Sequence, residues 1–152
     1  MHLAETDLAN WNPTEQYHSG FRSQAASWPS QPIQLFISSL ASGSYSTSSG
    51  ARPTIADLGC GDGQLAQTLV PRGFTVFSYD LVEKLPWINE AQCTKRVPLP
   101  GTAAAGGDAG AVVDVVVCCL SLMGNDWFGM ITESRRILRT GCVLVPFSSP
   151  ET

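Results

Sequence analysis

Apolar positions along the chain recur with two periods, one typical of helices and one typical of strands. Between residues 32 and 41 the apolar residues follow the spacing i, i+3, i+4, i+7, which predicts one buried helix face with Pro32 in the first turn. The run VVDVVVCCLSLMG, residues 112–124, is rich in β-branched residues, and its apolar residues do not alternate with polar ones as in a strand that is buried on one face only. It predicts a central strand over 112–122 that is buried on both faces.

The remaining apolar runs extend this alternation of strands and helices. Further strands are expected at 54–58, 74–80, 91–97 and 142–147, and further helices at 63–73 and 126–141, the last two ending at Gly73 and Gly141. This order predicts an α/β fold built on a doubly wound, mostly parallel sheet. The Ser/Gly-rich residues 42–53 predict a flexible linker, so we expect a helical segment at 1–41 and an α/β domain at 54–152.

Composition narrows the classes of protein that this chain could be. Its 152 residues suffice for one domain, and a net charge of −4 disfavours nucleic-acid binding by bulk electrostatics. The five cysteines include no C-x₂-C pair, so we expect free thiols and no metal site. The N-terminus lacks a signal-peptide pattern, and the apolar stretch at 111–124 is too short to span a bilayer. A soluble intracellular protein with no membrane partner is therefore expected.

The stretch ADLGCGDG, residues 56–63, predicts a glycine loop between a strand and a helix, a place where backbone N–H groups face a ligand. It fits a dinucleotide fingerprint poorly, because Gln64 stands where the third glycine would be. Acidic residues surround the loop: Asp57 ends the first strand, Asp62 lies in the turn, and Asp80 ends the second strand. They would repel a pyrophosphate but suit S-adenosylmethionine, which carries a sulfonium, an ammonium and a ribose whose hydroxyls Asp80 could bind. The alternative is an ordinary strand–helix turn with solvated aspartates.

The chain contains five further informative segments: YHSGFRSQAASWPSQP at 17–32, ADLGCGDGQLA at 56–66, VPL at 97–99, CLSLMG at 119–124 and ESRRILRTG at 133–141. Together these segments resemble the ribosomal RNA-processing protein 8 (nucleomethylin) family of S-adenosylmethionine-dependent methyltransferases. The resemblance spans roughly residues 15–145 and implies a Rossmann-like class I methyltransferase fold. It also implies a nucleolar protein that methylates N1 of an adenine in large-subunit ribosomal RNA, with links to nucleolar chromatin silencing.

The resemblance assigns roles to particular positions. His18 would cover the cofactor, with a plain surface histidine as the alternative, and Gly59 and Gly61 would lie under its methionine part. Asp80 would hold the ribose, and Cys119 would contact the cofactor from the end of the fourth strand. The adenine-side pair would be Cys93 and Thr94. No catalytic residue follows, because N1 methylation mainly requires the two reactants to be held close and aligned.

Three departures from the family pattern shape the functional expectation. Cys93 stands where the family has an aspartate that accepts from the adenine amino group, the segment 101–111 is longer than the family's turn, and the family's last strands do not follow "PFSSPET". The domain at 54–152 is thus expected to be a partial methyltransferase domain whose 142–147 strand is an open edge. The expected function is ribosomal RNA adenine-N1 methylation in the nucleus and nucleolus. The alternatives are a non-catalytic cofactor-binding module that meets nucleolar chromatin proteins, and an inactive truncated form.

Overall fold

The computed structural model describes Gly20, Ser23, residues 31–45, 47, 50–100, 111–123 and 125–147, with only the backbone described for 123 and 140–147. The helices and strands below lie in one compact unit, Pro32–Thr152. The predicted helix around residue 36 is present as α3 (Pro32–Ala41), with Phe36, Ile37 and Leu40 buried as the helical spacing requires.

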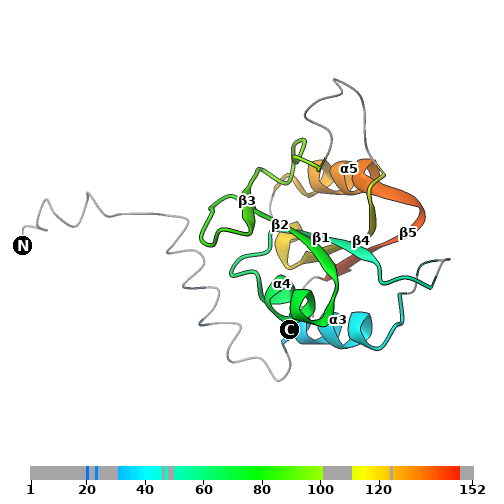
Figure 1. Cartoon of the computed structure of the whole chain (residues 1–152). Helices are drawn as coiled ribbons and strands as arrows, with labels where there is room; N and C mark the ends of the chain where they lie inside the picture. Colours follow the sequence, from blue (N-terminus) through cyan, green and yellow to red (C-terminus); the bar gives the residue numbers. More distant parts are fainter. Residues whose placement is uncertain are drawn as a thin grey trace, which may run out of the picture. The chain divides into compact units, whose positions relative to one another are not determined.

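A five-stranded sheet forms the middle of this unit, and every strand pair in it is parallel (Figure 1). The strands are β1 (Thr54–Leu58), β2 (Thr75–Asp80), β3 (Ile88–Glu90), β4 (Val113–Cys119) and β5 (Leu138–Phe147). Their order is β3-β2-β1-β4-β5, so the chain builds outward from β1 on one side and then returns to its other side. The predicted α/β fold is confirmed, and β4 is an interior strand as its β-branched run requires.

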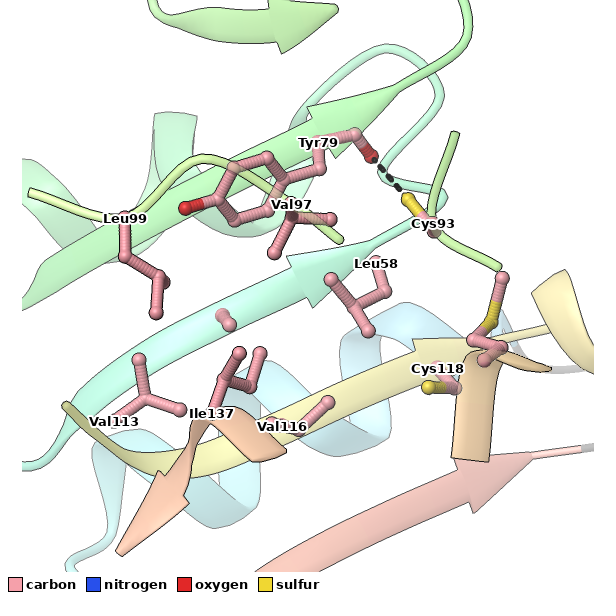
Figure 2. Packing of buried hydrophobic residues seen from close by; sticks show 11 residues of the cluster. Leu58, Tyr79, Cys93, Val97, Leu99, Val113, Val116, Cys118 and Ile137 are labelled. Atoms are coloured by element: carbon pink, nitrogen blue, oxygen red, sulfur yellow. Dashed lines mark hydrogen bonds between the residues drawn. The ribbon is translucent and has the colours of Figure 1, made fainter. Parts of the chain in front are cut away.

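The helices cover both faces of the sheet. On one face α3 and α4 (Gln64–Leu69) pack against Ile55 and Val115, and on the other α5 (Trp127–Ile137) packs through Met130 and Ile137 (Figure 1). Neighbouring residues of β4 alternate between the two cores: Val115 and Val117 join the first, while Val116 and Cys118 join the second (Figure 2). Cys118 is fully buried in the second core.

Two predicted boundaries are wrong. The third strand is Ile88–Glu90, where Ile88 pairs with Ser78, and residues 91–97 form no strand although Cys93 and Val97 are buried. The last helix ends at Ile137, without the predicted stop at Gly141, and β5 follows at once.

Contacts between residues that are far apart in the sequence explain why α5 ends before the predicted stop. Val112 N–H donates to the carbonyl of Ile137 (2.9 Å), and Arg139 Nη1 donates to Asp114 Oδ1 (2.6 Å). These contacts draw residues 138–139 alongside β4. Tertiary pairing therefore overrides the helical period, and α4 by contrast ends as predicted, through a 3₁₀ turn at Val70–Arg72 and a left-handed Gly73.

Candidate functional site at the carboxyl ends of the strands

The loop 59–63 connects β1 to α4 at the point where the strand order reverses, which is where open α/β sheets bind ligands. Gly59 and Gly61 have φ of 75° and 56°, a left-handed region that favours glycine. A Cβ on Gly59 would lie 2.5 Å from Ser121 Cβ, so this glycine lets the turn after β4 approach the loop. A Cβ on Gly61 would meet no described atom within 4 Å, so the loop backbone borders open space there.

Two buried carboxylates lie beside this loop. Asp57 near the end of β1 is 1% exposed, and Asp80 at the end of β2 is 6% exposed. Asp80 Oδ2 accepts a hydrogen bond from Gly61 N–H (2.8 Å), which fixes the carboxylate against the loop. Asp57 Oδ2 has no hydrogen-bond partner among the described residues. Burial, and after it the charge of Asp80, raises the pKa of Asp57 to about 7.

A buried acceptor without a partner is costly, and a positively charged ligand would relieve that cost. The third acid of the loop does not contribute, because Asp62 pairs with Lys84 (Oδ1 to Nζ, 3.5 Å) and is half exposed. The residues present therefore fit a cationic group beside Asp57 and a hydrogen-bond donor beside Asp80.

The backbone carbonyl of Tyr79 ties several parts of the site together, a role that no sequence signal could have revealed. It accepts from Gly59 N–H (2.9 Å), Cys60 N–H (3.0 Å) and the thiol of Cys93 (3.8 Å; Figure 2). Ala91 N–H donates to the carbonyl of Asp80 (2.7 Å), so the segment after β3 turns across the end of β2. The structure thus places the Cys93 thiol on the same carbonyl that holds the start of the loop.

The Cys93 side chain is a buried thiol and not a carboxylate substitute. Burial raises its pKa to about 12, so it stays protonated and donates to carbonyls. Its neighbour Thr94 has a buried hydroxyl oxygen without a partner among the described residues. Thr94 therefore offers the unused polar group in this segment.

Cys119 is the last residue of β4 and is half-buried, and burial raises its pKa to about 12 as well. It follows Val117, the residue that pairs with Asp57 of β1, by two positions. The next residue, Leu120, has φ of 63°, a strained value for a branched side chain at the turn that brings Ser121 to Gly59. No pattern in the sequence indicates the contact between Ser121 and Gly59. His18 lies outside the described residues.

No helix among the described residues is long and apolar enough to cross a bilayer. No cluster of three or more His, Cys, Asp or Glu side chains able to hold a metal ion occurs in that same part of the chain.

A parallel sheet with its glycine loop and acidic strand ends at the switch point defines a Rossmann-like fold of the methyltransferase kind. A protein family described as hypothetical methyltransferase matches residues 3–146. The chain belongs to this methyltransferase family, which implies that a methyl donor is the bound group.

Several relatives share a third or more of their aligned residues with this chain. Ribosomal RNA-processing protein 8 of Dictyostelium discoideum is 38% identical over 133 residues, which is 86% of this chain and 29% of the relative. The protein of the same name from Arabidopsis thaliana is 34% identical over 86% of this chain and 39% of its own length. The 25S rRNA (adenine(645)-N(1))-methyltransferase of Schizosaccharomyces pombe is 36% identical over 84% of this chain and 38% of its own length. The chain spans about a third of the length of these curated relatives.

Proposed function

We propose that this chain carries the S-adenosylmethionine site of a ribosomal RNA methyltransferase. The observation that supports this most directly is the buried Asp57 oxygen without a partner, beside a glycine loop that Asp80 holds in place. The ammonium and sulfonium of S-adenosylmethionine would provide a positively charged partner for the Asp57 carboxylate. Asp80 is positioned to accept hydrogen bonds from the ribose hydroxyls. Gly59 and Gly61 form the floor under the methionine part, Thr94 and Cys93 the adenine side, and Cys119 the wall at the end of β4.

The proposed substrate is N1 of an adenine in large-subunit ribosomal RNA. Support comes from relatives named 25S rRNA (adenine-N1)-methyltransferase in three fungi. The bound cofactor supplies an activated methyl group, and adenine N1 offers a lone pair. The protein then has to hold the two in line and exclude water, so no general base is assigned. With that substrate we propose the nucleus and nucleolus as the place of action.

The cofactor assignment is tested by calorimetry with S-adenosylmethionine and its demethylated product. Asp80→Ala should weaken binding at least tenfold, because a charge-assisted hydrogen bond and the loop anchor are both lost. Glu90→Ala, which removes an exposed acid from the end of β3, serves as the matched control and should bind as the wild type does. Equal affinity of Asp80→Ala and wild type would overturn the assignment.

The reaction itself is tested with radiolabelled S-adenosylmethionine and unmodified large-subunit ribosomal RNA. Label should appear at an adenine, and Asp80→Ala should reduce its incorporation. A longer chain that includes further strands should be assayed in parallel. Label from neither chain would contradict a methyltransferase role.

A second candidate function is a non-catalytic cofactor-binding module that contacts nucleolar chromatin proteins. The observation that favours it is Cys93, whose protonated thiol donates to the Tyr79 carbonyl and cannot accept from an adenine amino group. Cys93→Asp separates the two functions. If it strengthens cofactor binding and methyl transfer together, Cys93 marks a weakened enzyme; tight binding by the wild type without any transfer would favour the module.

The roles of the N-terminal region remain proposals as well. We propose that His18 covers the bound cofactor. We also propose that residues 42–53 are a linker between a helical segment at 1–41, whose helix α3 packs on the sheet, and a partial methyltransferase domain at 54–152. Protection of the backbone around residue 18 from hydrogen exchange on cofactor binding is the expected sign of such a cover.

A further inference from the structure

Two large aromatic side chains are exposed at the start of α5. Trp127 is 54% exposed and Phe128 is 69% exposed. Their rings are packed edge to face, with centroids 6.1 Å apart and planes at 84°. Burying these rings would normally contribute strongly to a core, so their exposure as a pair marks a surface that another molecule covers.

The first turn of α5, which carries this aromatic pair, lies beside the segment that forms one side of the proposed cofactor site. A Cβ on Gly129, the next residue, would lie 2.7 Å from the carbonyl oxygen of Thr94, so this turn touches the segment that carries Cys93 and Thr94. Gly129 thus permits a close approach between the helix that carries the aromatic pair and the proposed site. Leu35 and Val70, which are also exposed, belong to the elements on the opposite face of the sheet.

The same side of α5 continues with polar and basic groups. Phe128, Thr132 and Arg135 are spaced i, i+4, i+7 and all are exposed, so they follow one another along the helix. Thr132 Oγ1 donates to the carbonyl of Phe128 (2.9 Å). Arg136 pairs with Glu133 (Nε to Oε2, 2.7 Å) and Arg139 with Asp114, whereas Arg135 forms no ion pair in the described part of the chain.

We propose that this face of α5 binds single-stranded RNA next to the target base. One nucleobase stacks on the Trp127–Phe128 pair, and Arg135 contacts a phosphate further along the strand. Aromatic rings with a nearby cation suit unpaired nucleotides, because every base has a face to stack and every nucleotide a phosphate. Since the chain is acidic overall, stacking supplies most of the affinity and one arginine supplies a modest electrostatic share. The inference rests on the proposed function, since it concerns how that site takes its substrate.

The test is fluorescence anisotropy with a labelled single-stranded RNA oligonucleotide, measured with the demethylated cofactor present. Phe128→Ala should weaken RNA binding about tenfold, and Phe128→Tyr, which keeps a stacking ring, should stay within about twofold of wild type. Arg135→Gln should lower the slope of log Kd against log salt by about 0.7. Leu35→Ala, which removes an exposed side chain from the opposite face, should change neither quantity.

Several outcomes would overturn the proposal. Phe128→Ala could bind RNA as tightly as wild type, or the wild type could fail to bind single-stranded RNA at all. If Phe128→Ala instead abolished self-association seen by sedimentation and left RNA affinity unchanged, the surface would be a protein interface. Calorimetry with the cofactor on the same variants keeps the two hypotheses apart. If a variant loses RNA binding but keeps normal cofactor affinity, the result supports the RNA-binding role of this face of α5. If the wild type does not bind the cofactor, the result contradicts the proposed function and not the RNA-binding face.

Discussion

Asp57 is a carboxyl group held where water cannot reach it. Its pKa is raised to about 7 by burial and by the charge of Asp80. The carboxyl group therefore stays protonated to a pH well above that at which an exposed aspartate ionises. A cation in the site would favour the ionised form again. The charge of a bound ligand would therefore change the protonation state of Asp57.

This shift predicts a pH-dependent stability. The folded pKa lies above the unfolded value of 3.8, so the folded state binds more protons between these limits and the free energy of unfolding falls as pH rises from about 4 to 7. Urea unfolding at a series of pH values measures this slope. In Asp57→Asn the group no longer titrates, so the free energy of unfolding should fall less between pH 4 and 7 than it does in the wild type. The same pH dependence in the wild type and in the variant would contradict the assignment.

At this scale the sequence could indicate which residue types gather, but not how each is used. Asp57 and Asp80 stand at the ends of two predicted strands. Because parallel strands have their carboxyl ends at the same edge of a sheet, the two acids are expected to lie close together. The pairing of Asp62 with Lys84 was not predictable, since the two residues meet only through tertiary structure. The same holds for the Tyr79 carbonyl, because a backbone group leaves no mark in the sequence.

Among the elements, the loop 59–63 contains two glycines with different reasons to be glycine. We expect Gly59→Ala to cost several kcal/mol, because it adds a contact at 2.5 Å with Ser121 to an unfavourable positive φ. Gly61→Ala has the same backbone penalty of about 1–2 kcal/mol but no neighbour to displace. Chemical denaturation should therefore rank Gly59→Ala well below Gly61→Ala in stability. Cofactor titration should show weakened binding in folded Gly61→Ala, since its methyl group enters the open space beside the loop.

A buried ion pair on α5 holds the segment that forms the adenine side of the site. Glu133 Oε1 accepts from Val97 N–H (2.8 Å), and Arg136 Nη2 donates to the Val97 carbonyl (3.3 Å). Removing the carboxylate leaves a buried N–H without a partner and an arginine without its counter-charge. The pair therefore connects a helix to residues 93–97, which have no strand of their own.

We predict that Glu133→Ala lowers the free energy of unfolding by about 2 kcal/mol. Glu133→Gln keeps an acceptor for Val97 and should lose about half as much. The measurement is urea unfolding, with Glu90→Ala as an exposed-acid control that should stay within about 0.5 kcal/mol of wild type. If Glu133→Ala were as stable as that control, the pair would not anchor the segment.

Element prediction succeeded where one period runs long enough to be decisive. The α3 face and the β4 run were identified because burial follows their spacing. β3 has only three residues, too few for any period, and the end of α5 is set by the contact of Arg139 with Asp114, 25 positions away. Short elements and boundaries fixed by distant partners are the parts that local patterns cannot supply.

For the whole unit, β5 is an edge of the described sheet, with β4 as its only described neighbour. An open strand edge can pair with another chain, and the buried Asp57 oxygen without a described partner adds a cost of its own. We therefore expect a marginally stable unit that S-adenosylmethionine stabilises, by about 2.7 kcal/mol at a concentration one hundred times its Kd. Thermal melts with and without cofactor measure this effect, and sedimentation at increasing protein concentration should show association. A high melting temperature that ignores the cofactor, together with monomers throughout, would count against it.

The strand order has a consequence for synthesis on the ribosome. β1 ends at Leu58, and its second neighbour, β4, begins 55 residues later at Val113. At about 5–20 residues per second, this interval lasts about 3–11 s. During that time the nascent chain can pair β1 with β2 and β2 with β3, but the other side of β1 stays open. Chaperones that shield apolar strands would be needed most in those seconds, before β4, the second neighbour of β1, has been made.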